Sequence, residues 1–295
     1  MKDIQLGGMI STVVTPFDEN DEVDLDLLRG EVKYLLGQGV TAICACGSTG
    51  EGQTLSLEES AAICATVVDE VAGRVPVIGG VIQNSTAQAK RYSLALKEVG
   101  VDALQVTPVH YVFSPSPEET VAHYREIGEA TDLPIVLYNV VPWALVPVDT
   151  IELLRDVPQV VAIKQSGGDM HLLADLLHRM RERFVILAAL DDLHYPAFAM
   201  GAHGALAAIP TVTPALSVEL WNAVQSGDHA KALSLHERIL TVWRAIDAPN
   251  LPATLKAALE LQGRSPGLPR RPFQPATESD RARIRAALRT ANLID

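Results

Sequence analysis

The chain has 295 residues, of which 48% are hydrophobic and 20% charged, a composition that supports a large core and excludes global disorder. Its formal net charge of −12 argues against a nucleic-acid-binding surface and against an anionic membrane as partner. No apolar run reaches the roughly 18 residues of a membrane span, no signal-peptide core opens the chain, and three cysteines without paired spacing favour reduced thiols, so we expect a soluble, cytoplasmic protein.

Eight short apolar runs recur in the chain, and each predicts a β-strand. The predicted strands end near Val14, Cys46, Gly79, Val106, Tyr138, Lys164, Ala188 and Ala207. Successive ends lie 19 to 33 residues apart, which is the length of one strand, one helix and two loops. The runs at 41–46 and 134–138 are continuously apolar, which is typical of parallel strands covered on both faces.

The intervals between the predicted strands have the patterns of amphipathic helices. Residues 24–36 repeat leucine and valine at helical spacing. Helix-start signals, a serine followed three residues later by Glu or Gln, begin at Ser56, Ser85 and Ser116. They fall where the strand spacing requires helices.

Eight βα units in one chain predict a (β/α)8 TIM barrel, here assigned to residues 1–226. A doubly wound open sheet is the alternative, because periodicity does not show whether a sheet closes. No Gly-x-Gly-x-x-Gly motif follows the first strand, which disfavours it. Residues 227–295 have helical patterns without strands, notably at 229–247, at 253–262 and from 279, and predict a C-terminal helical extension.

In a barrel, residues at the carboxyl ends of the strands face one another, so chemistry is expected there. After the second predicted strand stands Gly47-Ser48-Thr49-Gly50-Glu51-Gly52. Glycines permit a tight turn with exposed N–H groups, and two hydroxyls accompany them, a combination that suits a carboxylate or phosphate. The alternative is a plain glycine-rich turn.

Lys164 closes the sixth predicted strand, and Tyr138 closes the fifth. Burial lowers the pKa of a lysine ammonium, and an unprotonated amine can attack a carbonyl carbon to form a Schiff base. A nearby phenol can relay protons. The alternatives are a lysine that reaches solvent or pairs with Asp191 or Glu51, and a tyrosine that belongs to the core.

The loop after the fourth predicted strand carries two titratable rings, His110 and Tyr111, which could also be interface residues. The eight histidines form no His-x-x-x-His pattern, so we expect no metal ion. No serine nucleophile elbow or Walker loop is present.

Together these motifs resemble those of the dihydrodipicolinate synthase/N-acetylneuraminate lyase family. The resemblance rests on residues 13–17, 47–51, 106–108, 138–140 and 163–164, and on 250–252, 256 and 268–269 in the extension. It implies a (β/α)8 barrel with a helical extension, often assembled as a homotetramer (a dimer of dimers). It also implies a class I lyase that acts on pyruvate or a related 2-oxo acid through a lysine imine, without a cofactor.

By resemblance, Lys164 corresponds to the Schiff-base lysine, Tyr138 to the proton-transferring phenol, and Ser48 to its relay partner. Thr49 and Ser48 correspond to the hydroxyls that bind the 2-oxo acid carboxylate. Gly47, Gly50 and Ala207 are further substrate-binding candidates.

Two departures stand out. The arginine that follows Tyr-Asn-Val in the synthases, where it holds the carboxylate of the aldehyde, is missing, and Trp143 is expected to occupy its place in the tail pocket. The second tyrosine of a Thr-Pro-Tyr-Tyr segment is replaced, with His110 or Tyr111 as the substitute. These departures favour a member other than a true dihydrodipicolinate synthase. The alternatives are a 2-oxo acid dehydratase, a hydratase-aldolase, 4-hydroxy-tetrahydrodipicolinate synthase, or a non-enzymatic carboxylate-binding barrel.

Overall fold

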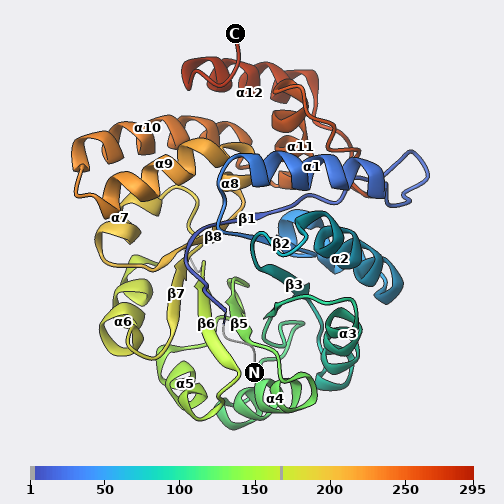
Figure 1. Ribbon diagram of the computed structural model, residues 1–295, viewed down its shortest axis with the longest axis vertical. Helices are drawn as coiled ribbons and strands as arrows, with labels where there is room; N and C mark the ends of the chain where they lie inside the picture. Colours follow the sequence, from blue (N-terminus) through green and yellow to red (C-terminus); the bar gives the residue numbers. More distant parts are fainter. Residues whose placement is uncertain (1–3, 167–168) are drawn as a thin grey trace.

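A computed structural model describes residues 4–166 and 169–295. Its centre is a closed barrel of eight parallel strands in chain order, with β1 paired to both β2 and β8 (Figure 1). The closure confirms the predicted TIM barrel and rules out the doubly wound open sheet.

The strands fall where the apolar runs predict them. They are β1 Gly8–Thr12, β2 Ala42–Ala45, β3 Val77–Val81, β4 Ala103–Val106, β5 Ile135–Asn139, β6 Val160–Gln165, β7 Val185–Ala188 and β8 Gly204–Ala207. The predicted ends at Val106, Ala188 and Ala207 are confirmed, and the others differ by one or two residues, the usual uncertainty where a strand runs into a loop.

Helices follow the strands around the barrel. They are α1 Leu25–Gly37, α2 Leu57–Val71, α3 Thr86–Glu98, α4 Pro117–Thr131, α5 Val148–Leu153, α6 Met170–Met180, α7 His194–Ala199, α8 Ile209–Val212 and α9 Pro214–Gln225, with short 3₁₀ turns η1 Ser48–Gly50, η2 Gly52–Thr54 and η3 Leu154–Asp156. The predicted helix starts are confirmed: Ser56 and Ser116 form complete capping boxes, and Ser85 accepts a hydrogen bond from the Gln88 N–H.

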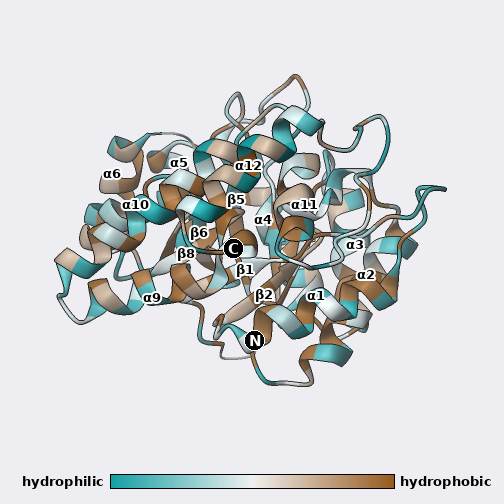
Figure 2. Ribbon diagram, turned by 90° about the horizontal axis from the view of Figure 1, so that it is seen from above, coloured by the Kyte–Doolittle hydropathy of each residue, from teal (hydrophilic) through white to brown (hydrophobic). Residues whose placement is uncertain are grey.

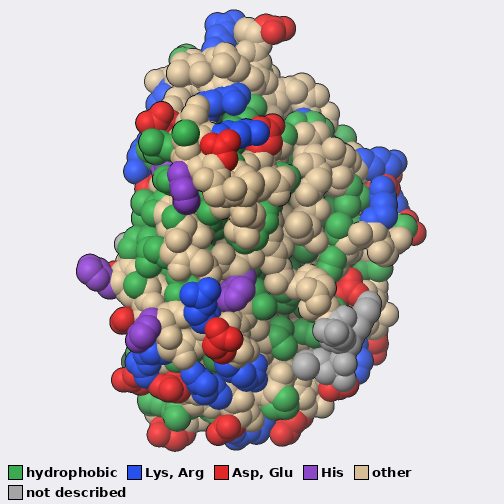
Figure 3. Space-filling view, turned by 60° about the vertical axis from the view of Figure 1, so that its left-hand side comes forward, with side chains coloured by type: hydrophobic (Ala, Val, Ile, Leu, Met, Phe, Trp, Pro, Cys, Tyr) green, Lys and Arg blue, Asp and Glu red, His purple; other side chains and the backbone are tan. Residues whose placement is uncertain are grey.

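Hydrophobic residues concentrate on the central strands and the inner faces of the helices, while hydrophilic residues lie on the periphery (Figure 2). One buried cluster lies between strands and helices, and a second fills the barrel interior with side chains such as Ile10, Ile78 and Leu206. The barrel is therefore a packed core rather than a pore. On the face in Figure 3, acidic and basic side chains are intermixed. No helix within residues 4–166 and 169–295 is both long and apolar enough to cross a membrane.

Three further helices follow the last strand's helices: α10 His229–Ile246, α11 Leu251–Leu261 and α12 Glu278–Thr290. They gather on one side of the barrel (Figure 1), where α10 packs on α9 and α11 contacts η1. Because η1 follows β2 directly, this contact brings the C-terminal extension to the carboxyl-terminal end of the strands, where barrel enzymes hold their active sites.

Candidate active site

The glycine-rich segment after β2 folds into a compact double turn. The N–H groups of Gly50 and Gly52 both donate to the Gly47 carbonyl oxygen, each at 3.0 Å. A Cβ at Gly52 would lie 2.0 Å from the Cys46 carbonyl oxygen, so no side chain fits there. The sequence suggests that the Gly50 N–H faces the substrate, but the structure shows it donated inside the loop. Ser48 begins the turn, where the backbone N–H groups lack helical acceptors.

Glu51 anchors this loop to the C-terminal extension. It is a buried, non-glycine residue in the left-handed region, with φ of 55°. Its carboxylate accepts from the Lys256 Nζ at 2.7 Å and from the Arg270 backbone N–H at 2.9 Å. Lys256 also donates to the Thr15 carbonyl at 2.7 Å. Burial lowers the pKa of Lys256, while Glu51 opposes that shift.

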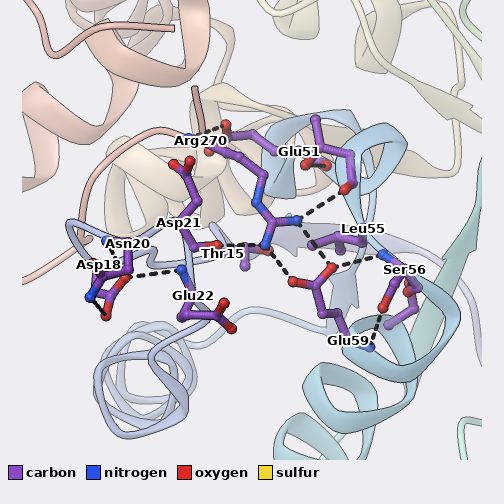
Figure 4. Close-up of polar contacts among 12 residues, drawn as sticks. Thr15, Asp18, Asn20, Asp21, Glu22, Glu51, Leu55, Ser56, Glu59 and Arg270 are labelled. Carbon is purple, nitrogen blue, oxygen red and sulfur yellow. Dashed lines mark hydrogen bonds and ion pairs between the residues drawn. The ribbon is translucent and has the colours of Figure 1, made fainter. Parts of the chain in front are cut away.

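The Arg270 guanidinium extends this anchor to the start of α2 (Figure 4). It pairs with the Glu59 carboxylate and donates to the Thr54 carbonyl at 2.9 Å. The hydrogen bond from the Arg270 guanidinium lowers the pKa of the Glu59 carboxyl. The Phe17 ring lies beside both cations, 4.3 Å from the Arg270 Cζ and 4.9 Å from the Lys256 Nζ. The C-terminal extension therefore clamps the loop that carries Ser48 and Thr49.

Tyr138 and Lys164 stand side by side on β5 and β6. They are register partners in the parallel ladder, so their side chains leave the same face of the sheet. The Lys164 Nζ lies 4.1 Å from the centroid of the Tyr138 ring. The Tyr138 hydroxyl donates to the Ser48 Oγ at 2.9 Å. Three candidates, two from neighbouring strands and one from the turn after β2, thus meet at one place.

Lys164 is only 5% exposed. Within the described chain, no carboxylate lies within ion-pair distance of its Nζ. The expected alternative, a structural pair with Glu51 or Asp191, is therefore not observed, since Glu51 pairs with Lys256. A buried amine without a counter-ion is an unusual and costly arrangement that is typical of functional lysines.

A cavity of about 390 Å³ opens above these groups. Among the residues predicted as site residues, it is lined by Ser48, Thr49, Tyr138, Lys164 and Ala207. Most of its remaining lining consists of residues that were not predicted as site residues, namely Gln53, Val140, Ser166, Ala189, Ala208, Trp243, Leu251, Pro252, Leu255 and Phe273. Five of these come from the C-terminal extension: Leu251 and Pro252 belong to the motif at 250–252, whereas no local motif marks Trp243, Leu255 and Phe273.

Asp191 also lines the cavity, from the loop after β7. Its Oδ1 accepts a hydrogen bond from the Ile209 N–H at 2.6 Å. Desolvation raises the pKa of Asp191 to about 6. Its carboxylate is therefore held at the cavity wall by the backbone and is charged above that pH.

Trp143, His110 and Tyr111 do not line the cavity. Trp143 is 72% exposed, and its Nε1 donates to the His110 carbonyl at 2.9 Å. The Asn139 amide closes the loop that carries Trp143, because it binds both the N–H and the carbonyl of Val146. Within this chain, the indole therefore does not fill the place expected for it in the tail pocket. The substrate-binding roles expected for the three residues stay predictions.

Comparisons with known proteins agree with this geometry. Residues 5–291 match the model of the dihydrodipicolinate synthetase family. A 4-hydroxy-tetrahydrodipicolinate synthase of Methanopyrus kandleri is 35% identical over 294 residues, 98% of each chain. One from Bacillus subtilis is 34% identical over 290 residues, 97% of this chain and 99% of its own.

Solved structures agree as well. The crystal structure of a dihydrodipicolinate synthase from Bacillus anthracis has a TM-score of 0.92 and 34% identity, covering 98% of this chain and 99% of its own. The names of these relatives give no support to the expectation that this chain departs from synthase activity.

Proposed function

The chain belongs to the dihydrodipicolinate synthetase family and is a lyase of the class I aldolase type, and we propose that Lys164 forms its imine with pyruvate or a related 2-oxo acid. The observation that carries the proposal is the buried Lys164 amine, placed in a cavity beside the Tyr138 ring at 4.1 Å and without a carboxylate partner in the described chain.

Binding begins at the turn after β2. The hydroxyls of Ser48 and Thr49, with the backbone N–H groups that open η1, receive the substrate carboxylate. The clamp of Glu51, Lys256 and Arg270 holds this turn in place. The keto carbon then faces the Lys164 Nζ, which is held without a counter-ion.

Imine formation follows. The Nζ attacks the keto carbon and a C–N bond forms. The keto oxygen leaves as water after it receives one proton from the amine and one through the Tyr138 hydroxyl, whose bond to Ser48 at 2.9 Å provides the relay. The product is a protonated imine, which withdraws electrons from the neighbouring carbon.

Carbon–carbon chemistry uses that electron sink. Loss of a proton from the neighbouring carbon gives an enamine, whose carbon bonds to the carbonyl carbon of an aldehyde while the aldehyde oxygen takes up a proton. Water then hydrolyses the imine and restores the Lys164 amine. Cleavage is the reverse sequence, and Tyr138 is the residue placed to move the protons in both directions.

A second candidate is 4-hydroxy-tetrahydrodipicolinate synthase activity, the name that the relatives carry. Dehydration or hydratase-aldolase chemistry uses the same imine and is the further alternative, whereas a carboxylate-binding barrel without turnover would require no buried strand-end amine. We also propose a cytoplasmic homo-oligomer, a dimer of dimers as in the family. Tyr111, Val112, Phe113 and Trp143 support an interface, because they are 67–79% exposed on neighbouring loops.

Borohydride reduction in the presence of pyruvate tests the proposal. Mass spectrometry of the digested protein should show a reduced pyruvate adduct on the peptide that contains Lys164. The Lys164→Ala variant should lose the adduct, and Lys231→Ala, which removes an exposed lysine, should keep it. The absence of an adduct with pyruvate and other 2-oxo acids on folded protein would refute the proposal.

A further inference from the structure

Part of the cavity lining comes from the C-terminal extension. Trp243 of α10, Leu251, Pro252 and Leu255 of α11, and Phe273 beyond them line it. Trp243 and Leu255 are buried, at 8% and 1% exposure, so their positions are fixed by packing. Together these five side chains form an apolar wall, defined here as the tail wall.

The described lining of the cavity offers no spare positive charge to a second substrate. Of the described residues that line it, Lys164 is the only cationic side chain, and the enamine that it carries when the aldehyde binds is uncharged. Asp191 supplies a carboxylate that the Ile209 N–H holds in place at 2.6 Å, and desolvation gives it a pKa of about 6. A second carboxylate on a bound aldehyde would meet no cation here, and at neutral pH it would face a like charge.

Apart from the groups that bind the 2-oxo acid, the polar side chains of the described lining are Asp191, Ser166 and Gln53. The Ser166 Oγ already donates to the Ala189 carbonyl at 3.0 Å. Gln53 is exposed at the rim. A polyhydroxylated chain would lose its hydrogen bonds to water and find few replacements, whereas an apolar chain gains by leaving water for the tail wall.

We propose that the second substrate is an uncharged aldehyde with an apolar chain, which packs against Trp243, Leu255 and Phe273. This inference rests on the proposed function, because the aldehyde must react with the enamine on Lys164. It assigns the specificity for the second substrate to the C-terminal extension. The loop after β5, which carries an arginine in the synthases that this chain resembles, lacks that arginine here.

A matched pair of aldehydes tests the charge argument. Methyl 4-oxobutanoate and 4-oxobutanoate share one skeleton and differ in a carboxylate. With pyruvate as donor and product measured by mass spectrometry, we expect kcat/KM at pH 7.5 to be at least about tenfold higher for the ester, since an unpaired buried charge is penalised by about that factor or more. Phenylacetaldehyde should also react, and glyceraldehyde should react poorly. Equal or better use of 4-oxobutanoate or glyceraldehyde would overturn the proposal.

Variants of the tail wall test where the specificity lies. Trp243→Ala should lower kcat/KM for phenylacetaldehyde about tenfold, and Phe273→Ala, which alters a half-buried residue on a loop, tests the same wall if the first variant folds poorly. Leu251→Arg should raise the use of 4-oxobutanoate by supplying the missing cation. If neither alanine variant changes the relative kcat/KM values of the aldehydes, the assignment to the tail wall is wrong.

The borohydride adduct with pyruvate, measured on the same samples, separates the two proposals. If the adduct forms but no neutral aldehyde turns over, the substrate class is wrong while the proposed imine stands. If no adduct forms on folded protein, the proposed function itself fails.

Discussion

Lys256→Met is the most informative single change, because it breaks the clamp beneath the substrate loop. The side chains of Lys256 and Glu51 are 3% and 0% exposed, and their charged atoms lie 2.7 Å apart. Methionine keeps the volume of the lysine stem but leaves the Glu51 carboxylate with the Arg270 backbone N–H and without its cation. Removing one partner of a buried ion pair costs about 3–5 kcal/mol.

Urea denaturation followed by circular dichroism measures this loss as a change in the free energy of unfolding at fixed protein concentration. Lys231→Met is the matched control, because its pair with Glu219 spans 3.6 Å with both side chains 52% exposed. Such exposed pairs contribute about 0–1 kcal/mol. The double variant Glu51→Gln/Lys256→Met should recover part of the loss, since no buried charge remains.

Lys256→Met should also raise the KM for pyruvate more than it lowers kcat, because the clamp positions Ser48 and Thr49 but touches no reacting atom. A loss below about 1 kcal/mol, indistinguishable from that of Lys231→Met, would refute the view that this pair stabilises the loop.

Three further changes test other parts of the site. Tyr138→Phe removes the hydroxyl bonded to Ser48 and should lower kcat by about a hundredfold, as expected for loss of a proton-transfer group, in a steady-state assay. Asp191→Asn should stabilise the protein by about 3 kcal/mol at pH 8 but much less near pH 4, measured by urea denaturation, because folding raises the pKa of the carboxyl from 3.8 to about 6 and its ionisation therefore destabilises the folded protein as the pH rises through that window. Gly52→Ala should destabilise by about 3 kcal/mol in the same assay, because its Cβ would meet the Cys46 carbonyl oxygen at 2.0 Å.

Each of these predictions has a contrary outcome. A kcat within threefold of the parent would remove Tyr138 from proton transfer. A stability difference for Asp191→Asn that is the same at pH 4 and pH 8 would show that its carboxyl does not titrate differently on folding. Gly30→Ala is the control for Gly52→Ala, since its added Cβ has no heavy atom within 4 Å apart from the nearby backbone of its own helix, and equal effects would contradict the steric argument.

The strand ends and the central site were predictable because two regular features determine them. Continuous apolar runs mark buried parallel strands, and a barrel directs the carboxyl end of every strand to one face. Lys164 and Tyr138 therefore had to approach each other once the barrel closed. The contact between Tyr138 and Ser48, 90 residues earlier, follows from the same closure.

The position of Trp143 was not predictable from its neighbours in sequence. Trp143 lies in a loop that the Asn139 amide closes onto Val146 through two hydrogen bonds. Two hydrogen bonds from one side-chain amide to a residue seven positions away leave no periodic pattern in the sequence. The direction of this loop could therefore not be predicted. The structure instead directs the indole outward to the His110 carbonyl.

The tail wall was not predictable either, because it joins residues that are far from the barrel motifs in the sequence. Trp243 and Leu255 occupy ordinary core positions of amphipathic helices, and a helical pattern identifies which side chains are buried but not what they are buried against. The place of Leu255 at the cavity follows from the anchoring of α11 through the adjacent Lys256 to Thr15 and Glu51 of the barrel. The contact that holds the substrate loop therefore also sets the wall that the second substrate meets, so substitutions in the clamp should alter aldehyde preference as well as pyruvate binding.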